Sequence, residues 1–244
     1  MQNIEFTVGH FKATECFREG WEFIKPHYWM FFAMTFVGML ISGMIPFGIA
    51  LGALNCGLYY VLFQLRDGKP PEFGDLFKGI QYFVPSLIAT MIMIIPIVIF
   101  TIVMWVSMFG ILFSSTDRRG NIDESAIFAM YGVMFVEGLV MAVVLSCIHA
   151  FIIFTYPLIV EYNLSGIEAF KVSSRAAWAN LGGVISLILC QFGLAFVGYL
   201  LCGFGLYLTL PIMWAGVFVA YQKVFPRPSA VNLDPPPPSA YQNL

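Results

Sequence analysis

Long apolar runs constrain this chain more than any other feature. A helix crosses the hydrocarbon core of a bilayer in about 20 residues, because each residue adds about 1.5 Å. In lipid, each backbone N–H and C=O group must also find its partner within the helix. The sequence contains six apolar runs of roughly this length or longer, at residues 28–44, 47–63, 82–113, 125–160, 181–201 and 205–224. It therefore predicts an all-α, polytopic transmembrane helix bundle with six spans.

The composition indicates that lipid surrounds most of the chain. Of its 244 residues, 59% are hydrophobic and only 11% are charged, whereas soluble domains carry about 25% charged residues. So few charges cannot cover a soluble globule of this size. The net charge is −2, and binding of nucleic acid needs a clustered basic face. We therefore expect the lipid bilayer as a partner and no nucleic acid. A membrane protein partner or a homo-oligomer remains open.

Basic residues indicate which ends of the spans face the cytoplasm. Only Arg118 and Arg119 lie on one side, in the loop between the third and fourth runs. The other ten lie on the opposite side: Lys12, Arg18, Lys25, Arg66, Lys69, Lys78, Lys171, Arg175, Lys223 and Arg227. Basic residues concentrate in cytoplasmic segments. This distribution predicts a multi-pass protein of a prokaryotic cell (inner) membrane with both termini in the cytoplasm, which requires an even number of spans.

The third and fourth runs are longer than one crossing of a bilayer. They must tilt, kink at Pro96 and Pro157, or project beyond the membrane. We expect projection around the polar loop at residues 114–124.

The chain divides into three parts. Residues 1–27 form a cytoplasmic N-terminal segment with an interfacial helix, residues 28–225 form the six-span membrane domain, and residues 226–244 form a Pro-rich tail. The tail has too few apolar residues to pack, so we expect it to be disordered.

A short pattern of acid, small or apolar residue, Phe and base recurs before three of the spans. It occurs at residues 15–18, 75–78 and 168–171. In the first copy Phe17, Trp21 and Ile24 recur at helical spacing, and in the third a capping box of Ser165 and Glu168 marks the helix start. Such amphipathic helices lie in the membrane interface with their aromatic residues towards lipid. We expect three units, each an interfacial helix followed by a transmembrane hairpin. The alternative is that cytoplasmic connectors share this pattern by chance.

Three pairs of segments resemble a known family. The first pair is residues 66–70 (Arg-Asp-Gly-Lys-Pro) and 75–79 (Asp-Leu-Phe-Lys-Gly), and the second is residues 156–161 (Tyr-Pro-Leu-Ile-Val-Glu) and 168–173 (Glu-Ala-Phe-Lys-Val-Ser). The third is residues 208–211 (Leu-Thr-Leu-Pro) with Ala220 and Tyr221. Together they resemble uncharacterised prokaryotic six-helix membrane proteins related to the membrane domain of some glycerophosphodiester phosphodiesterases. The chain departs from that pattern by its long central hairpin and by carrying no phosphodiesterase domain. The resemblance implies a six-helix fold and brings no established activity.

Four polar residues lie well inside the predicted spans: Asn55, Glu137, His149 and Gln191. An ionisable side chain in hydrocarbon costs free energy and therefore suggests a function. Glu137 is a candidate proton or cation site or, near the outer end of its run, a solvated carboxylate. His149 is a candidate proton relay, although a neutral imidazole bonded to a neighbouring helix explains it better. For Asn55 and Gln191 we expect hydrogen bonds between helices.

Small residues recur every four positions on two of the spans. They are Gly48, Gly52 and Cys56 on the second span, and Gly138, Ala142, Ser146 and Ala150 on the fourth. Small residues let membrane helices approach closely. We expect both stripes to be packing faces within the bundle, with an oligomer seam as the alternative.

Motifs for catalysis, cofactor binding and metal binding are absent from the sequence. It has no P-loop lysine, no His-x-x-x-His pair and no Gly-x-Ser-x-Gly elbow. Its five cysteines form no CxxC pair. We therefore expect no catalytic, cofactor-binding or metal-binding residues.

These observations favour a non-enzymatic scaffold or accessory subunit of a membrane assembly that contacts lipid through its interfacial helices. A transporter of a small solute or lipid is the alternative. The repeat and Glu137 favour it, and the scarcity of polar residues to line a path weakens it. An enzyme at the cytoplasmic interface that uses Glu161, Ser173 or Arg175 is a third hypothesis.

Overall fold

A computed structural model describes residues 4–9, 11–45, 48–115, 124–201 and 203–226, and these residues form helices and connectors with no strand. The predicted tail from residue 227 onward and most of the loop at residues 114–124, with Arg118 and Arg119, lie outside the described residues. The elements are α1 (Ala13–Ile24), η1 (Lys25–His27), α2 (Tyr28–Met44), α3 (Leu51–Arg66), η3 (Phe73–Tyr82), α4 (Phe83–Ser115), α5 (Glu124–Ile152), α6 (Thr155–Tyr162), α7 (Gly166–Ala179), α8 (Leu181–Leu200) and α9 (Phe204–Val224). The predicted all-α class is confirmed.

Five helical stretches among the described residues are long and apolar enough to cross a membrane. They are Ala13–Met44, Phe73–Ser115, Glu124–Tyr162, Leu181–Leu200 and Phe204–Val224. The second predicted span corresponds to α3, which has 16 residues and is therefore only about 24 Å long. The protein is thus a helical membrane protein with five evident spans and a shorter, largely buried sixth apolar helix.

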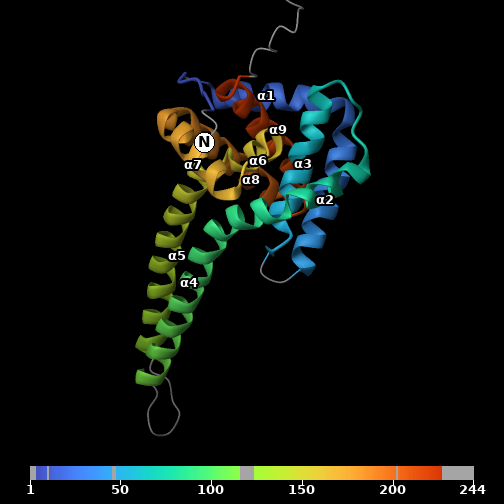
Figure 1. Cartoon of the computed structure of the whole chain (residues 1–244). Coiled ribbons are helices and arrows are strands. Elements are labelled where there is room, and N and C mark those ends of the chain that lie inside the picture. Colours follow the sequence, from blue (N-terminus) through green and yellow to red (C-terminus); the bar gives the residue numbers. More distant parts are fainter. Residues whose placement is uncertain (1–3, 10, 46–47, 116–123, 202, 227–244) are drawn as a thin grey trace, which may run out of the picture.

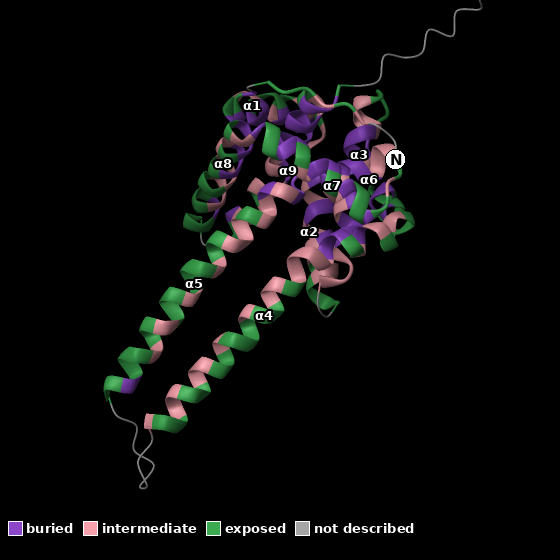
Figure 2. Cartoon of the chain, turned by 60° about the vertical axis from the view of Figure 1, so that its left-hand side comes forward, coloured by how far each residue is buried: buried purple, intermediate pink, exposed green. Residues whose placement is uncertain are grey.

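The molecule has two regions of different character (Figure 1). One is a bundle of α1–α3 and α6–α9, with the beginning of α4 and the end of α5. The other is a hairpin arm, defined here as residues 97–115 of α4 and 124–141 of α5, which reaches well beyond the ends of α2 and α3. Buried residues are concentrated in the bundle, whereas the arm is mostly exposed or intermediate (Figure 2).

The two prolines at which kinks were one predicted alternative, Pro96 and Pro157, have different surroundings. Pro96 lies inside the continuous helix α4, which has 33 residues and is therefore about 50 Å long. Pro157 instead follows a break, because α5 ends at Ile152 and α6 begins at Thr155. A proline in the first turn of a helix loses no intrahelical bond, whereas one inside a helix removes a bond and crowds the preceding turn.

A side chain from α7 satisfies the backbone at this break. The Ser173 hydroxyl donates to the Phe151 carbonyl at 2.6 Å and accepts from the Phe154 N–H at 3.2 Å. Ser173 is fully buried, as is Phe154. Because an unpaired backbone group in an apolar interior is costly, this one hydroxyl allows the chain to change direction between α5 and α6.

The apolar face of α1 differs from the prediction. Phe17 was expected to face lipid, but it is buried, as is Ile24, and Phe17 lies against Gly216 of α9. A methyl group at Gly20 would overlap the backbone of Ala215, so the two helices touch closely there. The prediction was wrong because glycines on two helices about 200 residues apart in sequence meet and create a packing surface for α1.

The other two copies of the motif also differ from one another. Asp75 in η3 is buried and pairs with Lys78 at 2.6 Å, while Phe77 is exposed. The capping box at the start of α7 is confirmed, since the Ser165 hydroxyl donates to the Glu168 carboxylate at 2.8 Å and accepts from its N–H at 3.4 Å.

On α7, two large apolar side chains are exposed. Ile167 and Trp178 face outward beside the charged residues Lys171 and Arg175. The face that α7 buries carries smaller residues: Gly166, Ala169, Val172, Ser173, Ala176 and Ala177.

Close backbone contact joins α3 to its neighbours. A methyl group at Gly57 would overlap the carbonyl oxygen of Leu76 in η3, and one at Gly52 would overlap Thr90 of α4. Cys56, between them on the same face, is fully buried. The packing stripe predicted on the second span is therefore confirmed for Gly52 and Cys56. Gly48 lies before α3, with a φ of 63°.

The two ends of the described chain meet. The Thr7 N–H donates to the Val224 carbonyl at 2.8 Å, and the Thr7 hydroxyl donates to the Lys223 carbonyl at 2.8 Å. The side-chain amide of Asn180 donates to the Thr7 carbonyl, and its oxygen accepts from the Gly9 N–H. The N-terminal segment is thereby fixed beside the end of α9 and the start of α8.

An ion pair closes the same end of the bundle. Arg66 of α3 donates to Glu161 of α6 at 2.7 Å, and the Tyr221 hydroxyl of α9 donates to the other carboxylate oxygen. Arg66 also lies over the Phe63 ring, 4.7 Å from its centroid. The side chains of Arg66 and Glu161 are 20% and 17% exposed, so water only partly screens their attraction.

Candidate intramembrane binding cavity

A cavity of about 570 Å³ lies inside the bundle. Ligand sites commonly have volumes of about 300–1,000 Å³, so this one has room for a small molecule or part of a lipid. Side chains from most of the surrounding helices line it: Met39, Leu51, Asn55, Tyr59, Met93, Ala142, Leu145, Ser146, His149, Ile152, Ile153, Tyr156, Ile188, Gln191, Phe192, Ala195, Leu210, Met213, Trp214 and Val217.

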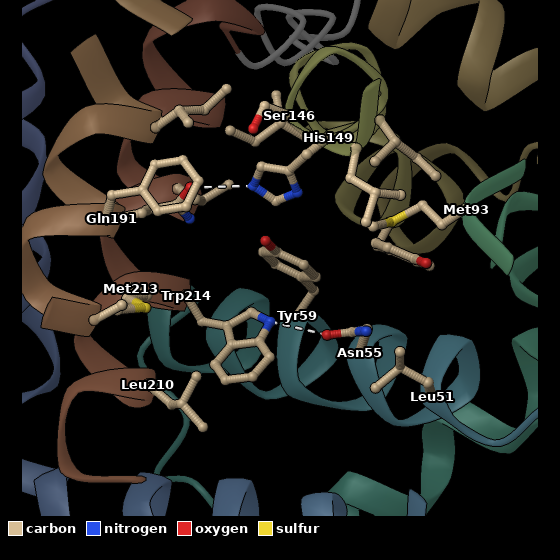
Figure 3. A pocket seen from close by; sticks show the side chains of 18 of the residues that line it. Leu51, Asn55, Tyr59, Met93, Ser146, His149, Gln191, Leu210, Met213 and Trp214 are labelled. Carbon is tan, nitrogen blue, oxygen red and sulfur yellow. Dashed lines mark hydrogen bonds between the residues drawn. The ribbon is translucent and has the colours of Figure 1, made fainter. Parts of the chain in front are cut away.

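Two hydrogen-bonded pairs face each other across this cavity (Figure 3). On one side, His149 Nε2 of α5 lies 3.1 Å from Gln191 Oε1 of α8. On the other, the Trp214 indole N–H of α9 donates to Asn55 Oδ1 of α3 at 2.9 Å. Each pair joins two helices, which is how membrane bundles satisfy polar side chains.

Tyr59 lies between the two pairs and points into the cavity (Figure 3). Tyr59 is buried, with only 4% of its surface exposed. A further hydroxyl pair borders the lining: Thr90 and Tyr156 are 3.0 Å apart, and the Thr90 hydroxyl is also 2.7 Å from the Ser86 carbonyl. The polar groups of the cavity are thus amides, hydroxyls, an imidazole and an indole.

The lining contains no Asp, Glu, Lys or Arg among the described residues. Ser146 also lines the cavity, and its hydroxyl donates to the Ala142 carbonyl. Apart from Ser146 and the polar groups named above, the lining residues are aliphatic, aromatic or thioethers. A cavity of this kind offers hydrogen bonds but no compensating charge. An ion or a charged group would have to leave water without an opposite charge, which is costly.

We infer from the exposure of its lining residues that the cavity opens between α5 and α8. Ala142 on α5 and Phe192 on α8 line it and are exposed. Their neighbours on the same helices are large, exposed and apolar: Val143 is 63% exposed and Leu189 is 64% exposed. An opening with such a rim faces hydrocarbon more favourably than water.

Glu137 lies apart from this cavity, on the hairpin arm. It accepts a hydrogen bond from the Ser107 hydroxyl of α4 at 2.9 Å. Its second carboxylate oxygen is buried and has no hydrogen-bond partner among the described residues. Glu137 therefore contributes to the contact between the two helices of the arm, and the structure does not bring it together with His149.

No group of three or more His, Cys, Asp or Glu residues within the described ranges has the spacing of a metal site. The charged groups that do meet, such as Arg66 and Glu161, already pair with one another.

Three of the four predicted polar residues line one cavity. Asn55, His149 and Gln191 each make the interhelical hydrogen bond expected from sequence. Sequence reasoning missed Tyr59 and Trp214. Both are aromatic residues in apolar runs, where a cavity residue and a core residue look alike.

The packing stripe predicted on the fourth span is wrong for most of its length. Of its four residues only Ala150 is buried. Ala142 and Ser146 line the cavity, and a methyl group at Gly138 would meet nothing within 4 Å. The small side chains there leave space open instead of bringing two backbones together.

Comparison with protein-family models, with curated proteins and with solved structures finds no match for this chain.

Proposed function

We propose that this protein is a non-enzymatic membrane protein that binds a lipid-type molecule in its intramembrane cavity and acts as a scaffold or accessory subunit of a membrane assembly. One observation carries the proposal: a cavity of about 570 Å³ with an apolar lining, uncharged polar pairs and an opening between α5 and α8. A lipid is the molecule that such an opening would meet in a bilayer, and its chain matches the apolar wall.

The character of the lining argues against an ion or a small polar solute as the ligand. A path for such a solute would need charged or densely polar walls, as in membrane transporters. Glu137, the carboxylate that favoured transport, lies outside the cavity. A carrier of a lipid is the second candidate, because the cavity opens sideways towards the region where lipid chains lie.

The proposal includes six spans, with α3 as the short one. The hydrogen bond between Thr7 and Val224 supports this number. Segments at the two ends of the chain can be neighbours on one membrane face only if the number of crossings is even. We further propose a prokaryotic inner membrane, cytoplasmic termini and interfacial positions for α1 and α7, in line with the distribution of basic residues. Labelling of a Lys69→Cys variant in intact cells would contradict this orientation if an impermeant thiol reagent reached it.

The resemblance of the connectors to six-helix membrane proteins is consistent with this arrangement and remains part of the proposal. Partners other than the bilayer are also proposals. The exposed apolar surface of the hairpin arm suits lipid, a membrane protein partner or a second copy of the chain.

Native mass spectrometry of the full chain, released from mild detergent, tests the proposed function. We expect a population with one bound lipid that survives detergent exchange. Ala195→Trp, which places a large side chain in the lining, should remove that population, while Gly193→Trp, two residues away on α8 and outside the lining, should retain it. Loss of all lipid from the unmodified protein under conditions that keep it folded would contradict the proposal.

A further inference from the structure

We infer that the cavity selects an uncharged lipid alcohol, such as a diacylglycerol, whose hydroxyl binds beside Tyr59, His149 and Gln191 and whose chains leave between α5 and α8. This inference rests on the proposed function and specifies the chemical class of the ligand. Its evidence is the set of hydrogen-bonding groups that the cavity lining leaves unpaired.

The His149–Gln191 pair has donors and an acceptor that are unpaired among the described residues. Because Gln191 Oε1 accepts from His149 Nε2, the ring hydrogen of the neutral imidazole is on Nε2, and Nδ1 is an acceptor with no partner among the described residues. The two hydrogens on the Gln191 amide nitrogen have no partner among the described residues. The Tyr59 hydroxyl, which points into the same space (Figure 3), has no partner among them either.

A hydroxyl group complements this arrangement better than a carbonyl group. It accepts from the Gln191 amide or from Tyr59, and it donates to His149 Nδ1. A carbonyl would satisfy the donors but leave Nδ1 without a hydrogen in a site from which water is displaced. Unsatisfied polar groups in such places weaken binding.

The position of these groups sets the direction of the ligand. Tyr59 is 4% exposed and lies at the inner wall, with the buried residues Ile153 and Val217 also in the lining. Phe192, at the opening, is 58% exposed. A lipid bound with its hydroxyl at the inner wall would place its chains along the apolar lining and through the opening into the bilayer.

The charge of the lining separates a lipid alcohol from a phospholipid. A phosphate group at the inner wall would find no Lys or Arg among the described residues that line the cavity. Arg66, at the end of α3, is already bonded to Glu161. A buried phosphate without an opposite charge is strongly disfavoured, so phospholipids should bind weakly although their chains are the same.

Fluorescence of Trp214 reports on this cavity directly, because the indole lines it. The reporter protein keeps Trp214 and replaces the other four tryptophans by Phe: Trp21, Trp29, Trp105 and Trp178. A second protein keeps only Trp105, which is 47% exposed on the hairpin arm, and serves as the reference for quenching outside the cavity. Both are placed in vesicles of dioleoylphosphatidylcholine with small mole fractions of a chain-brominated quencher.

Three quenchers with identical chains are compared: 1,2-diacylglycerol, its 3-acetyl ester and phosphatidic acid. We expect diacylglycerol to quench Trp214 at a mole fraction roughly fivefold to tenfold lower than the acetyl ester, and phosphatidic acid to be the weakest. Quenching of Trp105 should not differ among the three lipids. In the reporter protein, His149→Leu combined with Gln191→Leu should remove the preference, and Gln222→Leu, outside the lining, should preserve it. If the double variant fails to fold, Tyr59→Phe provides the test instead. It deletes only a hydroxyl and should reduce the preference.

The outcomes separate the two proposals. If none of the quenchers affects Trp214 at lower mole fractions than Trp105, the proposed function fails. If Trp214 is quenched at low mole fractions but the acetyl ester or phosphatidic acid matches diacylglycerol, the cavity binds lipid chains and the inference about the hydroxyl is overturned. A preference that survives both the double variant and Tyr59→Phe also overturns it.

Discussion

The bundle and the hairpin arm are both built from apolar helices but are stabilised in different ways. In α9, 50% of the most apolar stretch is buried inside the protein. In the helical stretch Phe73–Ser115, which ends with α4, only 11% of the most apolar part is buried. In the bundle, glycines bring backbones into contact, as at Gly57 with Leu76 and Gly20 with Ala215. In the arm, glycines such as Gly132 and Gly138 have nothing within 4 Å of an added methyl group.

This difference teaches that an apolar run in the sequence does not by itself tell a packed helix from an exposed one. The bundle needs particular small residues at particular positions because its helices contact one another. The arm presents an apolar surface to its surroundings, and the Ser107 hydroxyl donates to Glu137 between its two helices. Substitutions of the same kind should therefore have different effects in the two regions.

Gly57→Ala should give the largest effect. The added methyl group would overlap the Leu76 carbonyl, a backbone atom that cannot turn away. Overpacking costs about 1–3 kcal/mol, and we expect the upper end of that range, seen as a clearly lower melting temperature in detergent. The matched change Gly138→Ala in the arm should be neutral or slightly stabilising, since alanine favours helix over glycine. Equal melting temperatures for the two variants would break the comparison between the regions.

Glu161→Gln should give an intermediate effect. It removes the ion pair with Arg66 while keeping an acceptor for Tyr221. Arg66 then keeps only the more exposed Asp67, 3.2 Å from its Nε, as a counter-charge among the described residues, and we expect a loss of about 1–2 kcal/mol in the free energy of unfolding.

The matched change in the arm is Glu137→Gln. Its amide oxygen can still accept from Ser107, so stability should change little. A stronger effect at residue 137 than at residue 161 would show that the arm depends on its polar contact more than the bundle does.

Ala142→Leu should have the smallest effect on stability and sharpens the comparison at the boundary of the two regions. Ala142 is exposed and lines the cavity, so a larger side chain has space. We expect an unchanged melting temperature for the lipid-free protein and weaker lipid binding by native mass spectrometry. A markedly lower melting temperature would instead restore the close-packed stripe expected from sequence.

Several features could be predicted from sequence because they depend on local pattern. The apolar runs gave the helices, and Ser165 with Glu168 gave the start of α7. Polar residues inside apolar runs pointed to Asn55, His149 and Gln191, since such residues require partners wherever they lie.

Other features depend on contacts between distant segments. Burial of α1 requires Gly216, and the turn after α5 requires Ser173. The cavity itself arises where helices fail to touch, which the stripe of small residues on α5 did not reveal. A small residue permits close approach but does not enforce it, so the same pattern suits a helix contact and an open space.

A crystal structure of the full chain, grown from a lipidic mesophase containing diacylglycerol, tests the central claim most directly. The account predicts elongated density in the cavity, beginning beside Tyr59 and leaving between α5 and α8, with lipid chains around the arm. A collapsed cavity, with α5 packed against α8 through Ala142 and no ligand density, would contradict it.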